Sequence, residues 1–187
     1  MATDINILSS VEEKMKKTIQ SVQTEFVSLR TGRANPALLD RIIVDYWGTP
    51  TQLKQLAAIG VPDSRTLNIQ PFDRTSMEAI EKAILKSDLG LTPTNDGVIL
   101  RLHLPALTEE RRKELVKVVK KIGEEGKVGL RNERRDGVDK IKKQEKDGAV
   151  SKDESKKLQD QLQKMTDKYV VEIDKLISAK ETEIMER

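Results

Sequence analysis

The chain has 187 residues, of which 35% are charged and 3% aromatic, and its formal net charge is +3. This composition is typical of long solvated helices and disfavours a β-sandwich or barrel. The absence of cysteine excludes disulfides and thiolate metal sites. The N-terminal residues lack a signal-peptide pattern, and no apolar run approaches the roughly 20 residues of a membrane span. We therefore expect a soluble, intracellular protein without a membrane partner.

An apolar stripe at three- and four-residue spacing predicts a first helix. Its members are Leu8, Val11, Met15, Ile19, Val22, Phe26 and Leu29. The stripe stops before Gly32 and Pro36, which both oppose a continued helix.

Residues 37–105 change to a mixed α/β pattern. β-rich or alternating runs predict strands in three places, 42–47, 66–70 and 98–104. One helix interrupts them, with a capping box of Thr75 and Glu78 at its start and Gly90 at its end. Its expected apolar face is Met77, Ile80, Ile84 and Leu85.

Four aromatic or imidazole side chains of this region are candidates for recognition or catalysis. Tyr46, Trp47 and Phe72 lie near strand ends, where we expect them to form the core of a small domain rather than a recognition surface. The single histidine, His103, falls on the outward side of a strand, so we expect a surface position and no catalytic role.

Two long helices follow Pro105. The first begins at an N-cap provided by Thr108 and runs to about Lys146, with an apolar face of Leu115, Val118, Val119 and Ile122. After a break at 147–148, a capping box of Ser151 and Glu154 starts a helix that reaches the C-terminus. Its apolar face is Leu158, Leu162, Met165, Tyr169, Ile173, Leu176 and Ile184.

Three amphipathic helices that cannot bury their stripes alone predict a three-helix bundle. The fold class is therefore α+β, with residues 1–30 and 106–187 in the bundle and residues 31–105 in an inserted α/β domain. The two connections form a natural hinge, and its expected residues are Arg30, Thr31, Gly32, Arg33 and Pro105.

Gly126, Gly129 and Gly137 lie within the helix that ends near Lys146. Gly126 and Gly129 continue its apolar stripe, which indicates a close approach of a neighbouring helix. A local weakness or kink is the alternative reading of these glycines and of Gly137. Glu133 falls on the same face without an evident reason.

Positive charge is concentrated on this helix. Residues 111–146 contain 14 Lys and Arg against 7 Asp and Glu, whereas residues 147–187 contain 8 against 10. One face carries cations at helical spacing, Lys113, Lys117, Lys120, Lys127, Arg131 and Arg134, with Glu124 the only acid among them. Such a surface suits a polyphosphate partner.

The densest part is 131–136, where Arg131, Arg134 and Arg135 project away from the apolar stripe. Arginine binds phosphate through two parallel hydrogen bonds, so a structured RNA is the expected ligand. A solvated face with Glu–Arg pairs is the alternative. We find no phosphate-binding glycine loop, metal motif or nucleophile elbow, and therefore predict neither enzymatic activity nor a cofactor.

Several short motifs resemble those of the bacterial and organellar ribosome recycling factors and occur in the family's order. They are LRTGRA at 29–34, Gly48-Thr49-Pro50, DSRTL at 63–67, DLGL at 88–91, LTEERRK at 107–113 and RNERRD at 131–136. The resemblance covers almost the whole chain.

The resemblance implies an L-shaped protein that binds the post-termination ribosome and acts with elongation factor G. In that family GTP hydrolysis by elongation factor G drives separation of the subunits, and the inserted domain is the moving arm. Carried over, Arg134 is the first expected contact to large-subunit ribosomal RNA, with Arg131, Arg135 and Lys127 in support. We expect a monomer in the bacterial cytoplasm, or in an organelle matrix or stroma if the chain is a mature organellar form.

Two other functions remain possible from the residues alone. A helical chaperone or scaffold that binds protein would explain the stripes but not the concentration of positive charge. An RNA-modifying or aminoacylating enzyme would need a nucleotide or metal site, and the sequence shows none.

Overall fold

The computed structural model describes the backbone of residues 2–186 and the side chains of residues 7–186. The chain divides into two compact units. The first, which we call the helical unit, contains the residues up to Leu29 and those from Lys113 onward; the second, the inserted unit, is Arg30–Arg112. The second border falls within a helix, after Arg112, whereas the sequence places it after Pro105.

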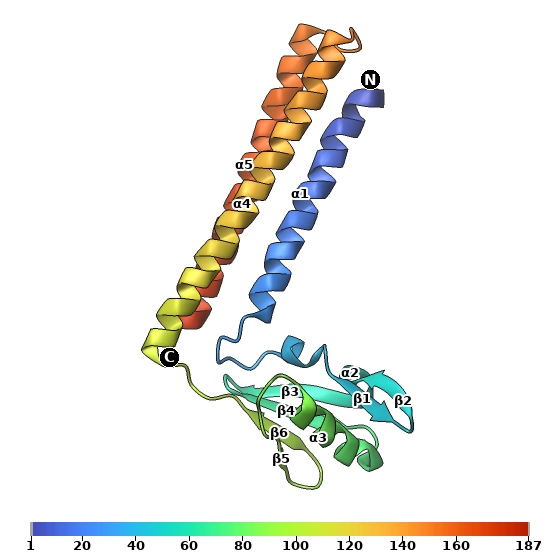
Figure 1. The fold of residues 1–187 in the computed structure, drawn as a ribbon, viewed down its shortest axis with the longest axis vertical. Helices are drawn as coiled ribbons and strands as arrows, with labels where there is room; N and C mark the ends of the chain where they lie inside the picture. The colour runs from blue at the N-terminus through green and yellow to red at the C-terminus, as the bar shows by residue number, and fades with distance from the viewer. Residues whose placement is uncertain (1, 187) are drawn as a thin grey trace. The chain divides into compact units, whose positions relative to one another are not determined.

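The helical unit is built from three helices that lie side by side (Figure 1): α1 (Ala2–Ser28), α4 (Glu109–Lys146) and α5 (Lys152–Met185). Its buried apolar side chains include members of each predicted stripe, among them Met15, Val22, Leu115, Val119, Leu162 and Ile173. Leu130 and Ile141 on α4 are also fully buried, although the prediction did not name them. The predicted helical bundle with a small α/β insertion is confirmed. Val118 does not belong to the apolar face, because its side chain is 40% exposed.

Local capping determines where α4 and α5 begin and end. The Thr108 hydroxyl accepts a hydrogen bond from the backbone N–H of Arg111 at 3.2 Å. Gly148, with φ of +75°, follows α4 in the left-handed conformation that ends many helices. The capping box of Ser151 and Glu154 is present as predicted.

Glycines allow α4 to approach α1 and α5 closely. A Cβ atom added to Gly126 would lie 2.6 Å from Cγ2 of Val22, and one added to Gly123 would lie 2.3 Å from Cδ1 of Ile177. A Cβ on Gly137 would lie 2.7 Å from Cδ2 of Leu162. Close approach explains these glycines, and α4 runs through all of them without a break.

Polar side chains also join the helices. Thr18 on α1 donates a hydrogen bond to Oε1 of Glu133 on α4 at 2.7 Å, which accounts for an acid on the inner side of that helix. Tyr169 on α5 is 4% exposed, and its hydroxyl donates to Oε1 of Glu12 on α1 at 2.9 Å.

The inserted unit contains two antiparallel sheets and one longer helix. Its elements are the 3₁₀ helices η1 (Pro36–Leu39) and η2 (Arg74–Ser76), the helices α2 (Leu53–Leu56) and α3 (Met77–Lys86), and the strands β1 (Ile43–Tyr46), β2 (Thr49–Gln52), β3 (Ala57–Asp63), β4 (Thr66–Pro71), β5 (Thr94–Asn95) and β6 (Leu100–His103). β1 pairs with β2, and the other strands form a sheet of order β3-β4-β6-β5. The core lies between this sheet and α3, with Ile69, Ile80, Ile84, Leu100 and Leu102 fully buried.

The start and end of α3 differ from the prediction. Asp73, rather than Thr75, accepts the capping hydrogen bond, from the backbone N–H of Thr75 at 2.9 Å, and this caps η2. Glu78 instead pairs with Lys82 at 2.6 Å. The helix ends at Lys86, before Gly90, and the predicted core residue Leu85 is 54% exposed.

The expectation that the aromatic residues of the insertion form its core is wrong for two of them. Trp47 is 81% exposed and Phe72 is 72% exposed, because both follow the last residue of a strand. Trp47 has a positive φ of +51° at the β1–β2 turn, whereas Tyr46 is half-buried and donates a hydrogen bond to Asp73 at 3.0 Å. His103 is exposed, as predicted.

Candidate nucleic-acid interface

Helix α4 holds its cationic side chains at fixed spacing because it is continuous from Glu109 to Lys146. Its inner side, which includes Leu115, Gly126 and Leu130, is buried against the other two helices. The orientation of each lysine and arginine around α4 is therefore determined by this packing.

Lys127 faces α5 and forms ion pairs with two carboxylates. Its side chain is only 13% exposed, and its Nζ atom lies 2.5 Å from Oδ1 of Asp174 and 3.1 Å from Oε1 of Glu124. The hydrogen bond to Asp174 raises the pKa of the Lys127 ammonium above its ordinary value, while burial acts in the opposite direction. This cation is already paired, which makes it a poor phosphate ligand.

Two further members of the predicted basic stripe lie on the same side of α4. Nζ of Lys120 is 3.5 Å from Oε1 of Glu181 on α5. The guanidinium of Arg134 is half-buried, and its Nη1 donates to Oε1 of Gln163 on α5 at 2.5 Å. Lys120, Lys127 and Arg134 thus border α5, where carboxylates neutralise the charge of the two lysines.

Arg131 and Arg135 have a different environment. Both side chains are exposed, and neither forms a hydrogen bond or ion pair with another residue in the described part of the chain. Together with the exposed Lys113 and Lys117, they give α4 an outward cationic face. We call the three arginines Arg131, Arg134 and Arg135 the arginine cluster; two are exposed and one is held by α5.

Two exposed valines also lie on α4, Val118 at 40% and Val128 at 48%. Val128 precedes Arg131 by three residues and therefore lies beside it on the outward face. The apolar spacing predicted a core position for Val118 and did not single out Val128. No local signal distinguishes an exposed valine from a buried one when the helix carries apolar residues on more than one side.

The predicted hinge residues lie together in the inserted unit. Thr31 is 8% exposed, and Gly32 has φ of +74°. A Cβ atom on Gly32 would lie 3.4 Å from the carbonyl oxygen of Pro105 and 3.1 Å from Cγ of Leu107, so the two connections pack against each other. Arg30 is exposed and bonded to the segment after α3.

Comparison with known proteins identifies the family. Residues 22–185 match the family described as "Ribosome recycling factor". The chain belongs to this family. The ribosome recycling factor of Trichodesmium erythraeum is 58% identical over 177 residues, which cover 95% of this chain and 97% of the relative. That of Desulforamulus reducens is 57% identical over 180 residues, covering 96% and 97%.

Solved structures of ribosome recycling factors share the fold. A solution structure of a family member matches with a TM-score of 0.79 at 44% identity, covering 97% of both chains. The T. thermophilus ribosome recycling factor, described with E. coli elongation factor G bound to the E. coli post-termination complex, matches with a TM-score of 0.69 at 43% identity and covers 98% of this chain and 99% of its own.

Among the residues that the structure describes, no helix combines the length and apolar character needed to cross a bilayer. Within the same residues, no group of three or more His, Asp or Glu side chains is arranged to hold a metal ion.

Proposed function

We propose that this protein recycles ribosomes. It binds the ribosome after termination and, with elongation factor G and GTP, separates the subunits so that mRNA and tRNA are released. The observation that carries this proposal is the near-complete match to ribosome recycling factors in sequence and fold, including one described in a post-termination complex with elongation factor G.

The helical unit is the proposed ribosome-binding part, and the arginine cluster its proposed contact to large-subunit ribosomal RNA. Arg131 and Arg135 offer exposed guanidinium groups that suit phosphate oxygens. Arg134 contributes once its bond to Gln163 is exchanged for one to RNA. Lys127 belongs to the same predicted set, but its two carboxylate partners place it last.

The inserted unit is the proposed moving part, on which elongation factor G acts. It turns relative to the helical unit at the connections that contain Arg30–Arg33 and Pro105. The action is mechanical, since the free energy comes from the GTPase and the factor itself makes and breaks no covalent bond. We propose that it works as a monomer in the bacterial cytoplasm, in line with its bacterial relatives.

A cell-free assay tests this function. Post-termination ribosomes are incubated with the protein, elongation factor G and GTP, and subunit separation is followed by light scattering. Separation should require all three components. Separation by the protein alone, or unchanged separation when GTP is replaced by a non-hydrolysable analogue, would refute the mechanical role.

A further inference from the structure

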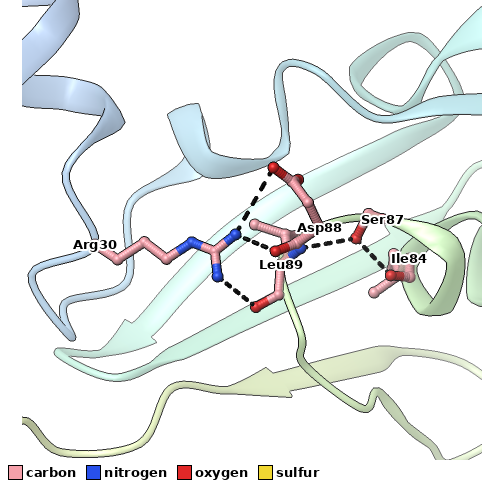
Figure 2. A network of polar contacts seen from close by, with 5 residues as sticks. All are labelled: Arg30, Ile84, Ser87, Asp88 and Leu89. Atoms are coloured by element: carbon pink, nitrogen blue, oxygen red, sulfur yellow. Dashed lines mark hydrogen bonds and ion pairs between the residues drawn. The ribbon is translucent and has the colours of Figure 1, made fainter.

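Arg30 is the first residue of the inserted unit after α1, and its guanidinium is bound to the segment that follows α3 (Figure 2). Nη1 donates to the carbonyl oxygen of Leu89 at 3.3 Å, and Nη2 donates to the carbonyl oxygen of Asp88. The Asp88 carboxylate is 98% exposed and 3.8 Å from Nη2, so it adds little. The two backbone carbonyls are the main acceptors.

The segment that receives Arg30 is itself fixed to the core of the inserted unit. The backbone N–H of Leu89 donates to Oγ of Ser87 at 3.4 Å, and this hydroxyl donates to the carbonyl oxygen of Ile84 at 2.5 Å (Figure 2). Ile84 is fully buried on α3, and Leu89 packs against the same core. Arg30 is therefore tied through a short chain of hydrogen bonds to the buried core of this unit.

The rest of the first connection is also attached to the inserted unit. Thr31 is buried, and Gly32 packs against Leu107 and the Pro105 carbonyl. The backbone N–H of Ala34 donates to the carbonyl oxygen of Ser64 at 2.8 Å. Arg30 is exposed and is held by its side chain, so this contact can open without disturbing the core.

We infer that Arg30 is a positioning residue that latches the first connection onto the inserted unit. While this contact, which we call the latch, is closed, rotation at the first connection is confined to the backbone bonds before Arg30, at the end of α1. When it opens, the flexible connection lengthens by one residue, at most about 3.4 Å, as far as the buried Thr31. The inference rests on the hinged movement in the proposed function and states which bonds carry it.

An arginine suits this role because its planar guanidinium places two donors at a fixed separation, which matches two successive carbonyl oxygens. A lysine keeps the charge but cannot span both carbonyls with the same rigidity. Since the side chain is exposed, the latch is weak and reversible, and its loss should change the ratio of closed to open states by roughly tenfold or less.

The test measures the spread of distances between the two units in the full chain, without ribosomes. The chain has no cysteine, so Gln161→Cys on α5 and Lys54→Cys on α2 give one spin label in each unit. Double electron–electron resonance is then recorded for the labelled protein and for its Arg30→Ala, Arg30→Lys and Asp88→Asn forms. Arg41→Ala is the matched control, because Arg41 is an exposed arginine of the same unit.

The distance distribution should broaden in Arg30→Ala and in Arg30→Lys, and stay unchanged in Asp88→Asn and Arg41→Ala. Amide exchange of Leu100 and Leu102 should be unaltered in all four, which shows that the core is intact and that the broadening is not unfolding. An unchanged distribution in Arg30→Ala would overturn the latch, and equal broadening in Asp88→Asn would overturn the assignment of the carbonyls. If Arg30→Ala does not fold, Arg30→Lys decides the question alone. Because no ribosome is present, failure here is distinct from failure in the recycling assay.

Discussion

The Nζ atom of Lys127 on α4 lies 2.5 Å from the Oδ1 atom of Asp174 on α5. This pair illustrates that the cations of α4 fall into two classes, according to the side of the helix on which they lie. Those that face α5 help to hold the helical unit together, and those that face away remain available to a polyanion. The two classes should respond differently to substitution.

Removing the charge of Lys127 should affect stability more than binding. We expect Lys127→Met, which keeps the apolar stem, to lower the free energy of unfolding by about 1 kcal/mol, because Asp174 is half-exposed and is not left as a buried charge. Ribosome affinity should change less than twofold. Urea denaturation and ribosome pelleting measure the two quantities, and a loss of affinity without a loss of stability would contradict this assignment.

Removing Arg131 or Arg135 should have the opposite effect. Each exposed guanidinium that contacts one phosphate contributes about one unit to the slope of log affinity against log salt concentration. We therefore expect Arg131→Ala and Arg135→Ala each to lower affinity and reduce that slope, with unchanged melting temperature. Lys164→Ala, an exposed lysine on α5, is the control. Retention of the full slope in the double variant would exclude these arginines from the interface.

Arg134 should show both effects in smaller measure, because it is bonded to Gln163. We expect Arg134→Ala to weaken ribosome binding and to reduce the free energy of unfolding by less than about 1 kcal/mol. Gln163→Ala leaves the guanidinium in place and frees it, so binding should be kept. If Gln163→Ala weakens binding as much as Arg134→Ala does, the pair acts through the structure of the helical unit.

The glycines of α4 offer a matched pair for packing. A Cβ atom on Gly126 would lie 2.6 Å from Val22 Cγ2, and valine in a helix has one strongly preferred rotamer, so the clash is hard to relieve. Gly126→Ala should lower the free energy of unfolding by about 1–3 kcal/mol. A Cβ atom on Gly129 would have Thr18 Cγ2 as its nearest neighbour, at the ordinary contact distance of 3.4 Å. Gly129→Ala should therefore raise the free energy of unfolding by about 0.5–1 kcal/mol. Equal responses to denaturant would contradict the close approach.

Tyr169 should make the stability of the helical unit sensitive to alkaline pH. Burial, followed by the hydrogen bond to Glu12, raises the pKa of the Tyr169 hydroxyl to about 12. Since the ordinary pKa of a tyrosine hydroxyl is 10.0, the folded state holds its proton more tightly than the unfolded state. The stabilisation is fully present below pH 10 and is lost as the pH rises to about 12, in total about 3 kcal/mol.

Absorbance of the phenolate measures this ionisation, and denaturation at several pH values measures its coupling to stability. In Tyr169→Phe the component that titrates near 12 should disappear. Tyr46→Phe is the comparison, since the chain has two tyrosines. A Tyr169 that ionises at its ordinary pKa would show that its hydroxyl is not buried beside Glu12.

Features determined by neighbouring residues could be predicted from the sequence. Thr108 and the Ser151–Glu154 box mark helix starts because capping uses hydrogen bonds within one turn. The apolar stripes of the long helices predict the bundle because their three- and four-residue spacing is also a local pattern of the sequence. The wrong start of α3 arose where two capping residues compete, and Asp73 takes the role expected of Thr75.

Features that depend on how one helix is rotated against another could not be predicted in this way. Spacing alone placed Lys127 with Arg131 in one basic stripe, yet packing turns the first toward Asp174 and leaves the second exposed. The exposure of the α4 valines, Trp47 and Phe72 could not be predicted either, because the hydrophobicity of a residue does not show which side of its helix or strand is covered.

The exposed indole at the β1–β2 turn gives this protein a built-in optical reporter. Trp47 is the only tryptophan in the sequence, and it belongs to the inserted unit. Its emission therefore describes that unit alone, while the long helices stay silent under selective excitation. A partner that covers the β1–β2 turn will shift the wavelength of the Trp47 emission maximum and reduce quenching of this emission by a soluble quencher. The rate at which a partner binds the inserted unit can therefore be measured on the unlabelled, unmodified chain.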